Sequence, residues 1–84
     1  MKKNIVCQVC GNYTISEYGS FDICPVCYWE DDGFCEDPDE VRGGPNKDLS
    51  LAQARRNFKE FGAIDREALR HIREPKKIEL PEYN

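Results

Sequence analysis

Four cysteines form two Cys-x-x-Cys pairs, and their type and spacing are suited to binding a metal ion. The pairs are Cys7–Cys10 and Cys24–Cys27, with thirteen residues between them. A Cys-x-x-Cys turn presents two sulfurs to one side of an ion, and thiolates suit the tetrahedral coordination of zinc. The spacing therefore predicts one site in which all four sulfurs hold Zn²⁺.

A site of this kind is expected to be structural rather than catalytic. Four thiolates leave no open position for water or substrate, whereas catalytic zinc keeps one. With 84 residues the chain is small for a domain that folds unaided. A structural zinc site contributes an apparent ~10–16 kcal/mol, so folding should depend on the metal. The sequence contains no recognisable catalytic constellation and no phosphate-binding glycine motif, and we expect no enzyme activity.

Two alternatives to zinc, disulfides and iron, remain for the four cysteines. Disulfides are disfavoured by the odd total of five cysteines and by the absence of a signal peptide or membrane span, which predicts the cytoplasm. Iron could occupy the same ligands, since the opening Met1-Lys2-Lys3 and the first cysteine turn are similar to rubredoxins. Tyr28 replaces the glycine that usually ends their second turn. Cys35 is expected to be a partly buried free thiol, and His71 a packed or solvated side chain rather than a ligand.

Propensity and capping patterns predict the elements around the metal site. Residues 13–16 and 21–23 are rich in aromatic and β-branched types, which predicts a hairpin with the metal turn at its open end. Ser50 and Gln53 form a capping box that opens a helix, and Gly62 is placed to end it. A shorter second helix is expected from Asp65 to just before Pro75. The predicted core residues are Trp29, Phe58, Phe61 and Leu69.

These elements define the expected architecture. We predict a single α+β domain over residues 1–84, a small zinc-ribbon or rubredoxin-like knuckle hairpin packed with two C-terminal helices. Its parts are the metal-binding hairpin (1–29), an acidic loop (30–48), the two helices (49–74) and a polar tail (75–84).

Charge is distributed unevenly, and the acidic part offers a candidate docking surface. The first 45 residues carry a net charge of −6 and the rest +2, within a total of −4. Residues 30–40 hold seven carboxylates. They can be a solvated loop, a calcium site of unusual spacing, or a patch that docks a basic protein partner. Trp29 either packs in the core or anchors such a partner. The candidate contact residues are Trp29, Glu30, Asp31, Asp32, Asp37 and Asp39.

The C-terminal helices carry a second, opposite patch. Eight lysines and arginines lie between residues 55 and 77, diluted by acidic residues. Nucleic-acid binding through this basic face is therefore an alternative function. The overall negative charge argues against it.

Several motifs in order resemble the bacterial cysteine-rich CPCC domain family. They are Cys7-Gln8-Val9-Cys10-Gly11, the run from Ile23 to Gly33, Gly43-Gly44-Pro45-Asn46, the helix from Ser50 to Ala63, and Arg73-x-Pro75. The family's Cys-Pro-Cys-Cys is here Cys7-Gln8-Val9-Cys10, so the outer pair that keeps the ligand spacing is retained. The resemblance implies a small zinc-ribbon-like domain, and it allows an immunity-type or regulatory role.

Overall fold

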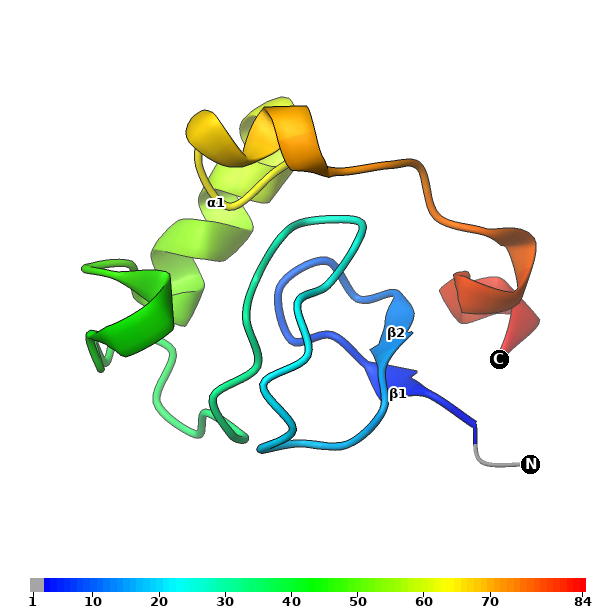
Figure 1. Cartoon of the computed structure of the whole chain (residues 1–84), viewed down its shortest axis with the longest axis horizontal. Coiled ribbons are helices and arrows are strands. Elements are labelled where there is room, and N and C mark those ends of the chain that lie inside the picture. The colour runs from blue at the N-terminus through cyan, green and yellow to red at the C-terminus, as the bar shows by residue number, and fades with distance from the viewer. Residues whose placement is uncertain (1–2) are drawn as a thin grey trace.

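Two short strands flank the first cysteine turn. In this computed structural model, which describes residues 3–84, β1 (Ile5–Val6) pairs antiparallel with β2 (Tyr13–Ile15). Ile5 lies opposite Ile15, and the register is irregular between Ile5 and Val6. Met1 and Lys2 of the rubredoxin-like opening lie outside the described residues. Figure 1 shows the strands beside the loops that carry the cysteines.

The predicted pairing of residues 13–16 with residues 21–23 is wrong. β2 pairs with β1 instead, and Phe21 has a φ of 62°, which interrupts an extended strand. Ile23 forms a single antiparallel bridge with Glu30. At each cysteine turn, the segment just before the turn therefore pairs with the segment just after it. Strand propensity alone does not identify which segments pair.

The first helix begins and ends as predicted. α1 spans Leu51–Phe61, the Ser50 hydroxyl accepts a hydrogen bond from the Gln53 N–H (3.0 Å), and Gly62 takes a left-handed φ of 97°. The other half of the predicted capping box does not form. The Gln53 side chain donates to the Asn57 side chain instead (2.8 Å).

The second predicted helix is a 3₁₀ segment, η2, over Glu67–His71. The Asp65 carboxylate accepts a hydrogen bond from the Ala68 N–H (2.8 Å) at its start. Leu69, predicted to be in the core, is 40% exposed, whereas Ala68 is 2% exposed. A 3₁₀ helix has three residues per turn, so one residue faces inward where an α-helix would bury a wider stripe.

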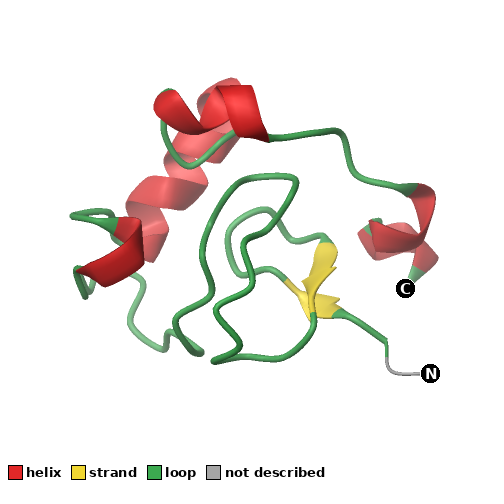
Figure 2. Cartoon of the chain, in the orientation of Figure 1, coloured by secondary structure: helices red, strands yellow, loops and turns green. Residues whose placement is uncertain are grey.

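The remaining elements are also short 3₁₀ turns: η1 (Gly44–Asn46), η3 (Lys77–Glu79) and η4 (Pro81–Tyr83). The tail is therefore not extended, and it crosses back so that η3 contacts β2 (Figure 1). Loops make up most of the metal-binding half (Figure 2). In the described part of the chain no helix has the length and hydropathy needed to cross a membrane.

The core is built around the cysteines. Cys7, Cys24 and Cys27 are at most 1% exposed. Trp29 is buried as predicted for a core residue, whereas Phe58 and Phe61 are only partly buried. The other buried hydrophobic residues are Val9, Ile15, Val26, Cys35, Leu51, Ala54, Ala63, Ile64 and Ala68. The molecule is thus a small α+β fold in which helix and strands enclose a sulfur cluster.

Candidate metal centre

The four sulfurs of Cys7, Cys10, Cys24 and Cys27 converge on one point. All lie within 4.8 Å of one another. The Cys7 and Cys27 Sγ atoms are 3.6 Å apart, and those of Cys10 and Cys24 are 3.7 Å apart. A tetrahedron with Zn–S bonds of about 2.3 Å has S–S edges of about 3.8 Å. The spacing therefore fits one ion with four thiolates, and it is far too long for a disulfide, which is about 2.05 Å.

The first cysteine turn is closed by two backbone hydrogen bonds. The Cys7 N–H donates to the Asn12 carbonyl (2.8 Å), and the Gly11 N–H donates to the Cys7 carbonyl (3.0 Å). Gly11 has a φ of 79°, a left-handed value that glycine adopts without steric cost. These two bonds hold the turn in a closed conformation in the folded chain.

The second turn repeats the same geometry. The Cys24 N–H donates to the Trp29 carbonyl (2.9 Å), and the Tyr28 N–H donates to the Cys24 carbonyl (2.8 Å). Tyr28 occupies the place of Gly11, with a φ of 76°. Its ring stacks on His71, with centroids 4.9 Å apart and planes 19° from parallel. His71 is therefore engaged with Tyr28 and is not among the four residues that meet at the cluster.

The electrostatics of the four thiols favour a cation. Interaction with the Cys10 thiol raises the pKa of Cys7 and of Cys27 and lowers the pKa of Cys24, and burial opposes ionisation at each. Thiols this close cannot all ionise unless positive charge compensates them, and metal ligands must be deprotonated. The Thr14 hydroxyl lies 3.0 Å from the Cys24 sulfur, where it can donate to a thiolate. Such a hydrogen bond orients a ligand from outside the coordination sphere.

The C-terminal half of the chain holds both turns through their carbonyls. The Arg55 Nε donates to the Gln8 carbonyl (2.7 Å), which ties α1 to the first turn. The Ile64 N–H donates to the Cys27 carbonyl (3.0 Å), and the Arg73 N–H donates to the Pro25 carbonyl (2.9 Å). Arg55 of α1, together with Ile64 and Arg73 after it, therefore fixes the position of one turn relative to the other.

Cys35 is separate from the cluster and buried, at 7% exposure. Its thiol donates to the Asp37 carbonyl (3.1 Å). The Gln8 side chain pairs with its backbone twice, accepting from the Cys35 N–H (2.9 Å) and donating to the Cys35 carbonyl (3.0 Å). Gln8, which lies between the two cysteines of the first turn, thus connects the cysteine cluster to the acidic loop. Its sequence position gave no sign of this role.

Two of the six predicted partner contacts are buried inside the fold. Trp29 is 6% exposed and Asp31 is 3% exposed, so neither side chain offers surface to a partner. The Asp31 carboxylate accepts hydrogen bonds from the Gly19 N–H (2.6 Å) and the Ser20 N–H (3.0 Å). Asp31 therefore stabilises the turn at residues 17–20, a role that a count of carboxylates cannot reveal.

The other four candidates are more accessible. The Glu30 side chain is half-buried, and its backbone pairs with the Asn46 side chain through two hydrogen bonds, of 3.0 and 2.7 Å. Asp32 is half-buried and forms an ion pair with Arg42 (3.3 Å). Asp37 and Asp39 are exposed, and the Asp37 carboxylate accepts from the Asp39 N–H (3.0 Å).

Arg42 holds the acidic loop together. Its guanidinium donates to the carbonyls of Asp32 (3.2 Å) and Phe34 (2.9 Å), and to the Glu40 carboxylate (3.2 Å). Sequence reasoning missed both Arg42 and the buried Asn46. The available signal for Arg42 was that it is a lone arginine in an acidic segment. For Asn46 it was the position directly after Gly-Gly-Pro.

Comparison with known proteins agrees with the geometry. No curated protein matches the chain. The family described as "Cysteine-rich CPCC" matches residues 5–79, a span that includes both cysteine turns, the acidic loop and α1. The chain therefore belongs to the cysteine-rich CPCC family.

Proposed function

We propose that the four cysteines hold Zn²⁺ as a structural ion in a zinc-ribbon-like domain, and that the protein is not an enzyme. The observation that carries this proposal is the closure of the cluster: four sulfurs converge, three are at most 1% exposed, and both turns are hydrogen-bonded to the rest of the chain. A site with no open position supports folding rather than catalysis.

Thiolates suit zinc and also iron, so an iron-containing electron carrier is the alternative that elemental analysis must exclude. Reduced thiols fit the cytoplasm.

The metal is tested by comparing matched cysteine variants. Protein expressed with both zinc and iron supplied should be colourless and contain one zinc per chain. Cys27→Ser should lose the metal and most of the fold, because a buried ligand is removed. Cys35→Ser makes the same chemical change outside the cluster and should retain one zinc. A red, reversibly reducible protein would support iron, and a folded, metal-free protein would overturn the proposal.

The function supported best is a non-catalytic module that binds a basic protein partner through the acidic loop. Four carboxylates are exposed there: Glu36, Asp37, Asp39 and Glu40. Phe34 and Val41, which flank them, are 55% and 54% exposed. Exposed hydrophobic side chains among charges of one sign supply contact area as well as electrostatic complementarity. An immunity-type or regulatory role would operate through this surface.

Charge reversal tests the docking surface. Asp37→Lys combined with Asp39→Lys should abolish capture of a specific partner from a lysate of the native host, with zinc content unchanged. Glu60→Lys combined with Glu82→Lys makes an equal change in net charge at exposed positions elsewhere, and it should leave capture intact. Equal capture by both double variants would discard the docking surface.

The basic C-terminal residues give the nucleic-acid alternative less support. Arg55 is bonded to Gln8, Arg73 is paired with Glu79, and the Arg66 guanidinium lies 4.5 Å from the centre of the Phe61 ring. These contacts engage three of the eight basic side chains within the fold. No retention of the zinc-loaded protein on DNA or RNA at low salt would remove this alternative.

A further inference from the structure

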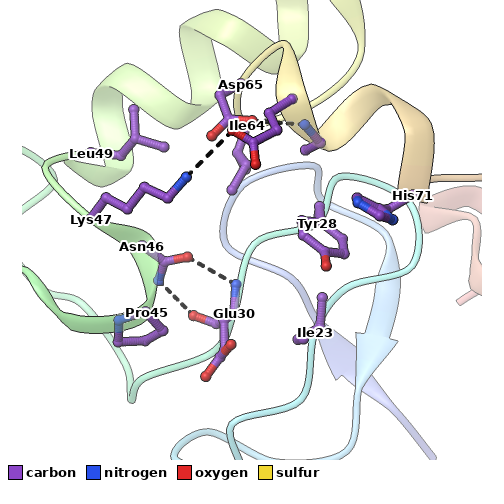
Figure 3. A pocket seen from close by; sticks show the side chains of 12 residues that line it. Ile23, Tyr28, Glu30, Pro45, Asn46, Lys47, Leu49, Ile64, Asp65 and His71 are labelled. Atoms are coloured by element: carbon purple, nitrogen blue, oxygen red, sulfur yellow. Dashed lines mark hydrogen bonds and ion pairs between the residues drawn. The ribbon is translucent and has the colours of Figure 1, made fainter.

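A pocket of about 240 Å³ lies between the second cysteine turn, η1 and η2. Figure 3 shows Tyr28 and Ile23 on one side of it, Asn46 and Lys47 opposite, and Ile64 with Asp65 closing another side. Ligand pockets for drug-sized molecules have volumes of about 300–1,000 Å³. The space here is smaller and suits a single side chain from another molecule.

One part of the pocket is aromatic and apolar. Tyr28 and His71 contribute their stacked rings, and Ile23, Ile64 and Ala68 contribute aliphatic surface. The Tyr28 backbone is held in the second cysteine turn, and its ring is held by stacking on His71. The pocket therefore has a fixed wall against which a planar group or an aliphatic stem can pack.

The polar part of the pocket is predominantly negative. It contains the carboxylates of Glu30, Asp65 and Glu67 and one cation, Lys47. Lys47 lies 3.9 Å from Glu67, and both side chains are mostly exposed, so this pair is weak. Within residues 3–84 the half-buried Glu30 carboxylate makes no hydrogen bond or ion pair. An entering cation would find an acceptor here.

We propose that this pocket receives an arginine side chain presented by a protein partner. The inference rests on the proposed function, because it names the group by which a basic partner would be recognised. Arginine fits better than lysine because its planar guanidinium stacks on aromatic rings and donates in a fork that matches carboxylates. Its aliphatic stem would pack against Ile23 and Ile64, and its guanidinium would reach Glu30.

The test is a titration that requires no knowledge of the partner. Zinc-loaded, ¹⁵N-labelled protein is titrated with the peptide acetyl-Gly-Arg-Gly-amide. A control peptide carries citrulline in place of arginine, because citrulline has nearly the shape of arginine but no charge. The arginine peptide should shift the amide signals of Tyr28, Asn46 and Ala68 saturably, and the citrulline peptide should bind at least about tenfold more weakly, since a charge-assisted hydrogen bond is lost.

Two matched variants locate the binding. Glu30→Gln keeps the backbone bonds to Asn46 and should weaken binding of the arginine peptide about tenfold. Glu60→Gln removes an exposed carboxylate outside both the pocket and the acidic loop, and it should have no effect. Equal binding of both peptides, shifts confined to other residues, or an unchanged affinity in Glu30→Gln would overturn the assignment. The arginine peptide could bind as expected while the Asp37/Asp39 charge-reversal variant still captures the partner. That pair of results would reject the acidic-loop proposal alone.

Discussion

Gly11 and Tyr28 occupy the same position in two copies of one turn, with φ values of 79° and 76°. Each donates its N–H to the carbonyl of the cysteine four residues earlier. The first copy uses glycine, which adopts this conformation freely, whereas the second places an L-residue there. The second turn therefore contains backbone strain that the first avoids, and it presents an aromatic ring toward His71.

Gly11→Ala tests the energetic value of the glycine. Apart from the two neighbouring residues in the chain, a Cβ at this position would have no atom within 4 Å, so the cost comes from the backbone conformation. The left-handed region costs an L-residue about 1–2 kcal/mol, and we expect that loss in the free energy of unfolding of the zinc-loaded protein. Urea denaturation measures it. Gly11→Asn should lose less, because asparagine tolerates this region, and full stability in Gly11→Ala would contradict the argument.

The cluster of four cysteines was predictable because its information is local. The two Cys-x-x-Cys turns adopt the same hydrogen-bonded geometry in this chain, and Ser50 and Gly62 mark the ends of α1 in the same local way. Strand pairing is not local. Residues 13–15 have clear strand propensity, yet their partner is β1 rather than residues 21–23. Propensity identifies a strand without naming its neighbour.

Burial of individual polar and apolar side chains was the least predictable feature. Asp31 lies in a run of acidic residues but is buried, because the chain places the N–H groups of Gly19 and Ser20 around its carboxylate. Leu69 is exposed because the segment adopts a 3₁₀ rather than an α-helical repeat. The first outcome depends on contacts between separate segments of the chain and the second on the type of helix, and composition and periodicity report neither.

Thr14→Val should weaken the metal site without changing its ligands. The substitution keeps the shape of the side chain and removes the hydroxyl that lies 3.0 Å from the Cys24 sulfur. Loss of a partner outside the coordination sphere lowers metal affinity by about 10–100-fold. Competition with a chelator of known affinity measures the change. Thr14→Ser retains a hydroxyl and should stay near the wild-type affinity. An unaltered affinity in Thr14→Val would show that the contact does not tune the site.

Gln8→Ala should loosen the acidic loop while leaving the four ligands in place. The variant removes both hydrogen bonds to the Cys35 backbone, and each unsatisfied group costs about 1–3 kcal/mol if it stays buried. Local opening of the loop avoids that cost and exposes the Cys35 thiol. We expect faster alkylation of Cys35, measured by mass spectrometry on zinc-loaded protein. Gln8→Glu keeps an acceptor for the Cys35 N–H and should show a smaller increase.

Glu79 makes the tail sensitive to acid. The Arg73 guanidinium donates to both of its carboxylate oxygens (2.9 Å each), the Lys76 N–H donates as well (2.8 Å), and Arg73 holds the pKa of Glu79 below its usual value. Because the pKa of Glu79 is lower in the folded than in the unfolded protein, its carboxylate stabilises the fold at pH values above the unfolded-state pKa of about 4.3. This contribution is lost as the pH falls through the folded-state pKa. Because Arg73 remains partly solvated, we expect a contribution of about 1 kcal/mol.

Comparing the wild type with Glu79→Gln isolates this effect from metal loss. Protons also compete for the cysteine ligands in acid, but they do so equally in both proteins. The wild type should melt several degrees higher at pH 6, since about 1 kcal/mol corresponds to ~4–8 °C in a domain of this size. The difference in melting temperature should shrink below about pH 4 as Glu79 is protonated. A difference that stayed constant across this range would mean that the Glu79 charge does not stabilise the tail.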